Sequence, residues 1–287
     1  MPKREPILLD RFYNESNLYE FALDEAGRGC LFGRVYIACV VLPKDPAVFS
    51  GVDGTNIKDS KKFSSKKKLG EVAEYIKRNA LAWHISWMDE CEIDKVNILK
   101  ATMKGMHSCI DQIFADLNDC ADLNHRRFEM GHSVSPISNF DVDPSEDVIP
   151  LQIFKGINKC LATVDGNYFT PYRRFDLSSN TICELPHITI EKGDGKYMGI
   201  AAASILAKNA SDQYVTDLCE KYPELVERYG LDTNMGYGTQ RHMDGIREHG
   251  ISQWHRKTFG PLCKNADTNI IILREPRFPC DPSFLKI

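Results

Sequence analysis

The fold is decided by the stretch Leu18-Tyr19-Glu20-Phe21-Ala22-Leu23-Asp24-Glu25-Ala26-Gly27-Arg28-Gly29. Its first half is bulky and apolar enough for a half-buried or central strand, which predicts a sheet in the core. Asp24 and Glu25 end this strand, and because neighbouring strand residues face opposite sides, one carboxylate should enter from the sheet and the other from its rim. Gly27 and Gly29 let backbone N–H groups approach a sugar or phosphate closely, and Arg28 adds a planar cation. This stretch alone leaves two interpretations open: a metal site that meets phosphate, and a strand-to-turn connection with solvated charges.

The rest of the chain predicts an α/β fold. Strands that begin as a hairpin and then alternate with helices are typical of a mixed sheet with helices on both faces. Further strands are expected at 35–42, 81–87, 161–164 and 188–190, and helices at 64–76 with Ser64 as cap, 99–117, 198–219, 223–229 and 240–249.

Two more acids follow predicted strands. Asp165 comes after 161–164 and Asp194 after 188–190, although each alone could be a turn-forming aspartate beside glycine. Carboxylates gathered at about 4 Å repel by roughly 4 kcal/mol per pair at an effective dielectric near 20, so a cluster requires cations or raised pKa values. Oxygen ligands favour Mg²⁺ or Mn²⁺, whereas zinc prefers His and Cys. Two such ions about 3.5 to 4 Å apart can activate water and stabilise a departing oxygen.

The string D-E-A-G-R-G-x-x-x-G-x-V-x-x-A-x-V-V-L, at 24–42, resembles the opening signature of type 2 ribonuclease H, or ribonuclease HII. Six further motifs match in that family's order over roughly residues 18–262, apart from a stretch in the middle. They are Asp59-Ser60-Lys61-Lys62, Val164-Asp165-Gly166-Asn167, Lys192-Gly193-Asp194, Ala201-Ala202-Ala203-Ser204-Ile205-Leu206-Ala207-Lys208, Gly236-Tyr237-Gly238-Thr239 and His255-Arg256-Lys257-Thr258-Phe259.

The resemblance implies a ribonuclease H-like fold: a mixed five-stranded sheet with helices on both faces and C-terminal helical segments. It also implies a Mg²⁺- or Mn²⁺-dependent endoribonuclease with a two-ion mechanism, acting in ribonucleotide removal and RNA primer degradation. Such an enzyme cuts 5′ to a ribonucleotide, in RNA-DNA hybrids and at single ribonucleotides in duplex DNA, and leaves 3′-hydroxyl and 5′-phosphate ends.

Two alternatives remain open. The sister type 3 enzyme prefers longer RNA tracts, but the G-R-G triplet and the short segment before Leu18 favour type 2. A hybrid-binding protein without activity is the other, and it would gain nothing from clustered negative charge.

The resemblance also assigns residues. Asp24, Glu25, Asp165 and Asp194 match the catalytic, metal-holding acids, with Asp24 as the expected bridging ligand. The backbone of Gly27, Arg28 and Gly29 would sense the 2′-hydroxyl, and such a pocket can reject a deoxy analogue by about 10⁴ to 10⁵. Tyr237 matches the tyrosine that stacks on the neighbouring deoxyribose, and Lys61, Arg28 and Lys192 are candidate phosphate contacts. A structural tyrosine and solvated lysines are the simpler alternatives.

Three positions depart from the family pattern: Cys30 and Arg34 stand where proline is usual, and Asn209 where an apolar residue is. Cys30 and Arg34 lie in or beside the substrate loop, so the replacement of proline at these two positions affects how rigid that loop is expected to be. Ala201-Ala202-Ala203-Ser204 is interpreted as structural support, because small residues let a helix lie close to the sheet and hold Asp194 in place.

Charge and composition set further expectations. The formal net charge is −4, but residues 111–147 carry nine acids and two arginines, or −7, which leaves +3 for the rest. Nucleic acid is the expected partner, and a monomer the expected state. No apolar run is long enough to cross a bilayer and no signal peptide is recognisable, so we expect no membrane partner and a cytoplasmic, intracellular location, or a nuclear one in a eukaryote. The ten scattered cysteines are expected to be reduced thiols.

The sequence predicts three parts: an N-terminal extension (1–17), a catalytic domain (18–262) and an extended C-terminal tail (263–287). Within the domain, 118–150 is an acidic insertion, either irregular or a partner surface, and the former is favoured. Residues 169–175 mix aromatics with arginines, so they could contact nucleic acid, but surface packing is the preferred interpretation.

Overall fold

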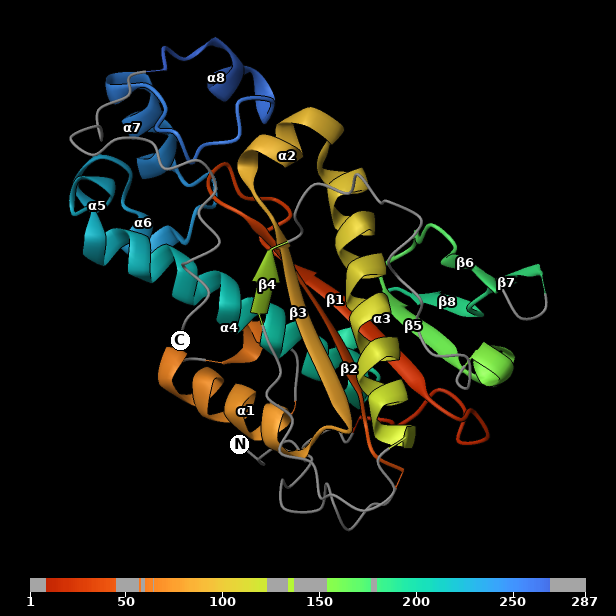
Figure 1. Cartoon of the computed structure of the whole chain (residues 1–287). Coiled ribbons are helices and arrows are strands. Elements are labelled where there is room, and N and C mark those ends of the chain that lie inside the picture. The colour runs from red at the N-terminus through yellow and green to blue at the C-terminus, as the bar shows by residue number, and fades with distance from the viewer. Residues whose placement is uncertain are drawn as a thin grey trace.

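A computed structural model describes residues 9–44, 57, 60–63, 65–122, 134–136, 154–176 and 180–268 of the chain. A mixed six-stranded sheet lies at its centre, with the order β4-β3-β2-β1-β5-β8 (Figure 1). The strands are β1 Glu20–Ala26, β2 Val35–Val41, β3 Ala82–Met88, β4 Val134–Pro136, β5 Leu161–Asp165 and β8 His187–Ile190.

The sheet combines a meander with parallel strands. β1, β2 and β3 pair antiparallel in sequence order. β5 then pairs parallel to the other side of β1, with Leu23 opposite Val164, and β8 pairs parallel to β5. The carboxyl ends of β1, β5 and β8 therefore lie side by side at one end of the sheet.

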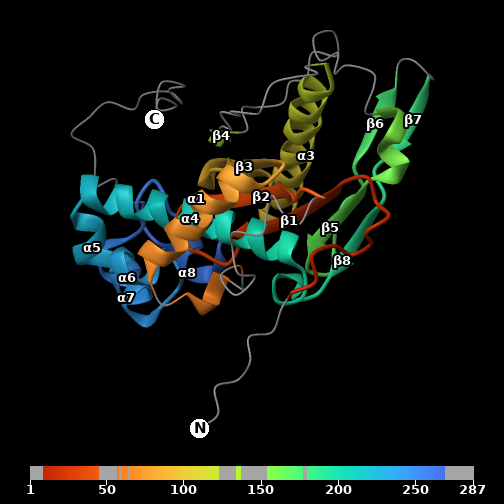
Figure 2. The same ribbon diagram turned by 90° about the horizontal axis from the view of Figure 1, so that it is seen from below.

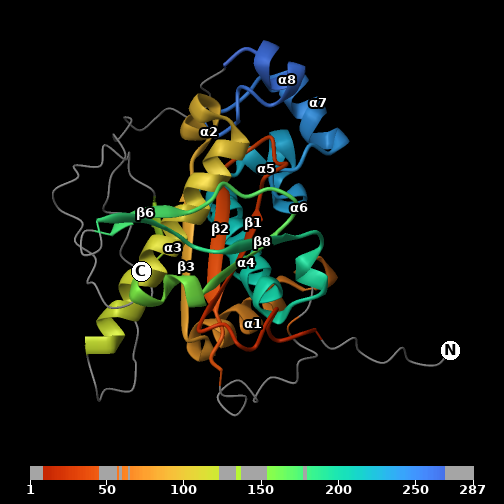
Figure 3. The same ribbon diagram turned by 90° about the vertical axis from the view of Figure 1, so that its right-hand side faces the viewer.

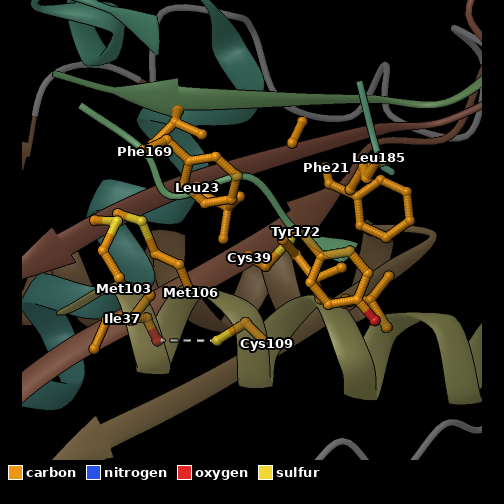
Figure 4. Packing of buried hydrophobic residues seen from close by; sticks show 14 of the residues in the cluster. Phe21, Leu23, Ile37, Cys39, Met103, Met106, Cys109, Phe169, Tyr172 and Leu185 are labelled. Carbon is orange, nitrogen blue, oxygen red and sulfur yellow. Dashed lines mark hydrogen bonds between the residues drawn. The ribbon is translucent and has the colours of Figure 1, made fainter. Parts of the chain in front are cut away.

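Helices cover both faces of the sheet (Figure 2). Helix α3 (Ile98–Asp122) packs on one face, where its apolar side chains join those of β1 and β2 in the main core. Figure 4 shows Met103, Met106 and Cys109 of this helix below the strands, with the Cys109 thiol 3.6 Å from the Ile37 carbonyl oxygen. Helices α1 (Lys66–Asn79) and α4 (Met198–Lys221) cover the opposite face.

Strand alternation decides which side chains of β1 face which layer. Phe21 and Leu23 belong to the core beneath α3, so Ala22 and Asp24 point toward α4. Helix α4 approaches β1 closely, because a Cβ on Gly199 would lie 2.8 Å from the Ala22 Cβ. The small residues of α4 thus bring a helix directly over the face that carries Asp24.

A compact helical cluster closes the end of the sheet where β1 ends (Figure 1). It contains α5 (Glu224–Tyr229), α6 (Leu231–Asn234), α7 (Gln240–His249) and α8 (Gly260–Asn265), packed with the C-terminal half of α4 and with Phe32. Between β3 and α3 lies α2 (Glu90–Val96), and short 3-10 helices span η1 Ser60–Lys62, η2 Phe154–Lys159 and η3 Gly193–Gly195.

A separate hairpin, β6 (Arg173–Asp176) with β7 (Thr181–Glu184), lies beside α3 (Figure 3). Three of the aromatic and arginine residues at 169–175 pack against the rest of the protein, whereas Arg173 and Phe175 are exposed. Phe169 and Tyr172 are buried in the main core, and Arg174 pairs with Asp111 of α3. The interpretation of 169–175 as a packed surface segment therefore agrees with the structure.

The predicted ribonuclease H-like α/β fold is confirmed, with the five expected strands at its centre and β4 as a sixth, short one. The sequence analysis missed α2, α6, α8 and the β6–β7 hairpin because each is too short to show a clear period. The long helices end within a few residues of the expected positions. Ser64, the expected cap of α1, lies outside the described residues, and Ser65 precedes the helix instead.

The division into domains stays a prediction. In the extension, the Asp10 backbone bonds to Lys196 and Met198, so its described part packs on the domain. Helix α8 crosses the predicted boundary at 262, with Cys263 buried. The 118–150 insertion is described only for the end of α3 and for β4.

Two general features can be stated for the described residues. None of their helices combines the length and the apolar character needed to cross a membrane. The eight cysteines whose side chains the structure describes are free thiols, and among these eight only Cys91 is exposed.

The two interior glycines of α7 and α1 provide a matched test of helix packing. A Cβ on Gly245 would lie 2.0 Å from the Arg228 carbonyl oxygen, whereas a Cβ on Gly70 would make only an ordinary contact at 3.6 Å. Gly245→Ala should therefore lower the free energy of unfolding by about 1 to 3 kcal/mol through overpacking of α7 against α5. Gly70→Ala should raise it by about 0.5 to 1 kcal/mol through helix propensity. Urea unfolding measures both, and equal effects would contradict the packing.

Candidate active site

Asp24 and Asp165 are neighbours on the sheet. Leu23 pairs with Val164, and each aspartate is the next residue along its parallel strand. Both therefore project from the face that α4 covers, at the carboxyl end of the strands. Asp24 is only 5% exposed, and its Oδ1 accepts a hydrogen bond of 2.7 Å from the Glu25 N–H.

Two serines hold the buried aspartate. The Ser204 side chain of α4 hydrogen-bonds to the Asp24 carboxyl, and the Ser204 Oγ lies 2.9 Å from the Ser60 Oγ of η1. When the Asp24 carboxyl is ionised it can only accept, so Ser204 then donates to it and Ser60 donates to Ser204. The sequence analysis treated Ser204 as structural support and gave Ser60 no role. Only the fold shows that these hydroxyls connect the Lys61 segment to Asp24.

The pKa values of Asp24 and Glu25 reflect negative charge that is not fully compensated. The pKa of Asp24 is raised well above its usual value, mainly by burial and then by the charges of Asp165 and Glu25, while the bond from Ser204 opposes this. Burial also raises the pKa of Glu25, and the Asp165 charge adds to it. Arg28, whose Nη1 lies 3.2 Å from the Glu25 Oε1, is the main opposing influence on Glu25, with a smaller one from Lys61.

Asp194 reaches the same end of the sheet through η3. The Gly193 N–H in front of it donates to the Asp165 Oδ1 at 2.6 Å. Asp194 is 6% exposed, and its Oδ2 lies 3.7 Å from the Lys61 Nζ. Lys192 is exposed, in the left-handed conformation with φ 55°, directly before the turn. The structure therefore connects Asp194 to Asp165 through a backbone bond and to Glu25 through the shared cation Lys61.

The donor set fits a hard divalent cation in its chemistry. Four carboxyl groups lie at one end of the sheet. Burial and then the charges of Asp165 and Glu25 raise the pKa of Asp24, and an added cation would oppose this shift. Within the described ranges, however, no three His, Cys, Asp or Glu side chains are arranged so that they could hold a metal ion as they stand. The carboxyl groups would have to turn toward an ion upon binding.

The Gly27–Gly29 loop follows β1 directly and contains two glycines with different constraints. Gly27 has φ 83°, and a Cβ there would lie 2.9 Å from the Arg34 carbonyl oxygen, so the fold itself requires glycine. A Cβ on Gly29 would meet no described atom within 4 Å, and Gly29 is exposed. The packing of the described protein therefore does not require glycine at 29, and its predicted role in binding a ligand stays a prediction.

A buried arginine anchors this loop. Arg256 is fully buried and donates to the carbonyl oxygens of Gly33, Arg34 and Arg28, at 2.8, 2.9 and 3.1 Å. Burial lowers the pKa of its guanidinium to about 10, so it remains charged at neutral pH. The sequence analysis counted Arg256 only within a motif and a basic cluster. Its burial could not be read from the sequence, because arginine is usually exposed.

Tyr237 lies against the same loop. The Leu31 N–H donates to the Gly236 carbonyl oxygen at 2.9 Å, and the Tyr237 side chain bonds to the Cys30 thiol. Tyr237 is nonetheless 42% exposed, so one part of its ring is available to a ligand. Lys208, paired with Asp212 at 2.7 Å, lies 5.8 Å from the ring centre, a cation that the sequence analysis did not single out.

The two departures from proline leave the loop well anchored. Burial raises the pKa of the Cys30 thiol to about 11, so the thiol stays protonated at neutral pH and serves as a packed neighbour of Tyr237. The Arg34 guanidinium lies between the rings of Trp87 and Tyr214, 3.5 and 4.3 Å from their centres. These contacts restrict the loop by packing rather than by proline rings.

Comparison with known proteins agrees with this geometry. The family model described as Ribonuclease HII matches residues 22–119 and 137–261. The ribonuclease HII of Parabacteroides distasonis is 38% identical over 247 residues, which cover 86% of this chain and 92% of that protein. The ribonuclease HII of Bacteroides thetaiotaomicron is 35% identical over 250 residues, or 87% of this chain and 94% of that protein.

Solved structures share the fold at lower identity. The ribonuclease HII of Archaeoglobus fulgidus, determined in a complex with PCNA, gives a TM-score of 0.52 at 22% identity and covers 85% of this chain and 96% of that one. The ribonuclease H2 of Pyrococcus horikoshii gives 0.51 at 20% identity, covering 86% and 96%. Together with the family match, these findings show that the chain belongs to the ribonuclease HII family and is a ribonuclease H, a nuclease that hydrolyses nucleic acid.

Proposed function

We propose that this ribonuclease H uses divalent cations, Mg²⁺ or Mn²⁺, to cut the phosphodiester bond 5′ to a ribonucleotide. Its substrates are RNA-DNA hybrids and duplex DNA with single embedded ribonucleotides, and its products carry 3′-hydroxyl and 5′-phosphate ends. The observation that carries the proposal is the pairing of Leu23 with Val164, which sets Asp24 beside Asp165 next to the exposed Gly29.

In this proposal Asp24, Glu25, Asp165 and Asp194 hold the cations. Asp24 would be the central ligand of the four, because it feels the charges of both Asp165 and Glu25. Bound cations would supply the positive charge that lowers the pKa of an attacking water and stabilises the departing oxygen. Ser204 hydrogen-bonds to the Asp24 carboxyl, and Lys61 and Lys192 contact phosphate.

The position of the cut requires water as nucleophile. The bond broken on the 5′ side of a ribonucleotide joins phosphorus to the 3′-oxygen of the preceding nucleotide, so that oxygen leaves as the 3′-hydroxyl. The 2′-hydroxyl of the selected ribose neighbours its own 3′-phosphate and is not placed to attack the 5′ one. It therefore serves for recognition, which we assign to the backbone of Gly27, Arg28 and Gly29, with Tyr237 stacking on the neighbouring sugar.

The first test offers the protein a duplex with one embedded ribonucleotide, an all-RNA hybrid and an all-DNA duplex, each with Mg²⁺ or with chelator. We expect both ribonucleotide substrates to be cut with Mg²⁺ only, and the single site to be cut on its 5′ side. Gel analysis of end-labelled strands measures the products. If the hybrid is cut but the single-ribonucleotide duplex stays intact, the result would favour the substrate preference of the type 3 enzyme. If no substrate is cut, the result would favour a hybrid-binding protein without activity.

Asp24→Asn tests the cation site without relying on activity alone. The folded-state pKa of Asp24 is raised, so its contribution to stability is present at acidic pH, below the pKa of the unfolded chain, and is lost as pH rises. At neutral pH in chelator the variant should therefore melt at the same temperature as the parent or higher, since the amide can still accept from Glu25 and Ser204.

Mg²⁺ should raise the melting temperature of the parent, because it binds the folded state, and should raise that of Asp24→Asn less. Cutting by the variant should fall by at least about 100-fold, as for the loss of a group that stabilises the transition state. Calorimetry of both proteins with and without Mg²⁺ measures these shifts in melting temperature. Equal Mg²⁺ shifts in both proteins would rule out Asp24 as a ligand.

The two loop glycines separate recognition from folding. Gly29→Ala should change the free energy of unfolding by less than about 0.5 kcal/mol, as at an ordinary surface site, because space surrounds it. Its cutting at a single ribonucleotide should fall about 100-fold, as expected when a reacting group is displaced by about 1 Å.

Gly27→Ala is the contrasting variant. It should be destabilised by about 1 to 2 kcal/mol or more, because its φ is positive and its Cβ would contact the Arg34 carbonyl. Unfolding curves and initial rates measure both. A fully active Gly29→Ala protein would remove the loop from the recognition step.

A further inference from the structure

Two buried histidines form a chain of hydrogen bonds behind Tyr237. His242 lies in α7 and His255 in the segment before α8, and their Nε2 atoms are 3.1 Å apart. Their exposed fractions are 0% and 1%. Rings of Tyr229 and Phe32 pack against His255 at 4.7 and 5.1 Å between centres, so the pair is enclosed by aromatic groups.

The partners at the two ends fix the direction of this chain. The Ser252 N–H and Oγ lie 3.0 and 2.8 Å from the His255 Nδ1. Because the N–H can only donate, Nδ1 accepts, and the proton of neutral His255 is on Nε2. At the other end the His242 Nδ1 lies 2.9 Å from the Tyr237 carbonyl oxygen, which can only accept. His242 therefore donates from Nδ1 and accepts at Nε2, and both ends give the same pair of tautomers.

The pair is held neutral by its surroundings. Burial lowers the pKa of His242, and it lowers that of His255 further, with the neighbouring His242 adding to the effect. A second proton on His242 would sit on Nε2 and face the His255 Nε2–H, and a second proton on His255 would sit on Nδ1 and face the Ser252 N–H. The chain from Ser252 to Tyr237 is therefore intact only while both rings are neutral.

The pair ends on the residue that presents the tyrosine ring. Met235 and Gly236, with φ of 49° and 86°, turn the chain sharply before Tyr237, and the Tyr237 carbonyl oxygen accepts from Thr239 as well as from His242. The neighbour of His255, Arg256, binds the carbonyl groups of the recognition loop. The dipeptide His255-Arg256 thus connects to Tyr237 through His242 and to the Gly27–Gly29 loop through Arg256, and these are the two sides of the surface proposed to bind the ribonucleotide.

We propose that His242 and His255 are positioning residues that fix the Tyr237 peptide, and with it the ring that meets the nucleic acid, relative to the Gly27–Gly29 loop. This inference rests on the proposed function only in that Tyr237 contacts the substrate. Because the pair acts through Tyr237, its loss should weaken substrate binding and leave the chemical step intact.

Substitution of His242 by asparagine or by glutamine tests its two hydrogen bonds separately. The Asn amide nitrogen occupies the place of Nδ1, so His242→Asn can still donate to Tyr237. The Gln amide reaches the place of Nε2, so His242→Gln keeps the contact with His255 and loses the one with Tyr237. On a duplex with one ribonucleotide, His242→Gln should raise KM about 10-fold and leave kcat within about twofold of the parent. A 10-fold change in KM falls within the range of about 5- to 150-fold that the loss of a stacking contact produces. His242→Asn should stay within about threefold of the parent.

At His255 the expected effects of the asparagine and glutamine substitutions are reversed. In His255→Gln the amide nitrogen can still donate to His242, whereas His255→Asn cannot reach it. His255→Asn should therefore raise KM more than His255→Gln does, which provides the test if His242→Gln fails to fold. Thermal melting of all four proteins identifies any that are unfolded.

A double-mutant cycle with Tyr237→Ala completes the test. Tyr237→Ala should itself raise KM, and His242→Gln should add nothing further once the ring is gone. Equal KM values for the Asn and Gln variants, or an unchanged 10-fold effect of His242→Gln in the Tyr237→Ala background, would show that the histidines only fill the core. If the parent cuts but Tyr237→Ala has the KM of the parent, the role of Tyr237 in the proposed function fails instead.

Discussion

The parallel pairing of β1 with β5 is the constraint on which the site depends. It sets Asp24 beside Asp165 on the face covered by α4, where burial and mutual repulsion raise the pKa of Asp24. A fold gains nothing in stability from like charges gathered in a low-dielectric region. The rest of the structure keeps them there: α4 supplies the Ser204 hydroxyl, and η3 supplies a backbone N–H to Asp165.

The C-terminal helical cluster has a matching purpose on the other side of the site. It holds the loop after β1 through the three carbonyl contacts of Arg256, and it holds the Tyr237 turn through α7. The sheet therefore positions the negative groups, and the cluster positions the neutral and backbone groups beside them. Under the proposed function, such a division would let the carboxyl groups turn toward cations while the Gly27–Gly29 loop and Tyr237 stay fixed.

Much of this organisation was predictable from local pattern. The strand ending in Asp24, the helix at 198–219 and the acids after two further strands follow from periodicity and from the residues that end each element. Short elements such as α2 and the β6–β7 hairpin were missed because they carry too few residues for a period to emerge. Ser204 was assigned to packing because nothing in its neighbours along the chain signals a carboxyl group above it.

The sequence by itself determined the family, the α/β class and which acids stand at strand ends, because those properties are encoded in residues close to one another along the chain. Only the tertiary structure decided that Arg256 is buried against the loop at 28–34, that Gly27 is required by the fold while Gly29 is not, and that His242 and His255 join Ser252 to Tyr237. Each of these facts is a contact between segments far apart in the chain. Hydrogen bonding and burial depend on which atoms meet in space, and no local pattern records that.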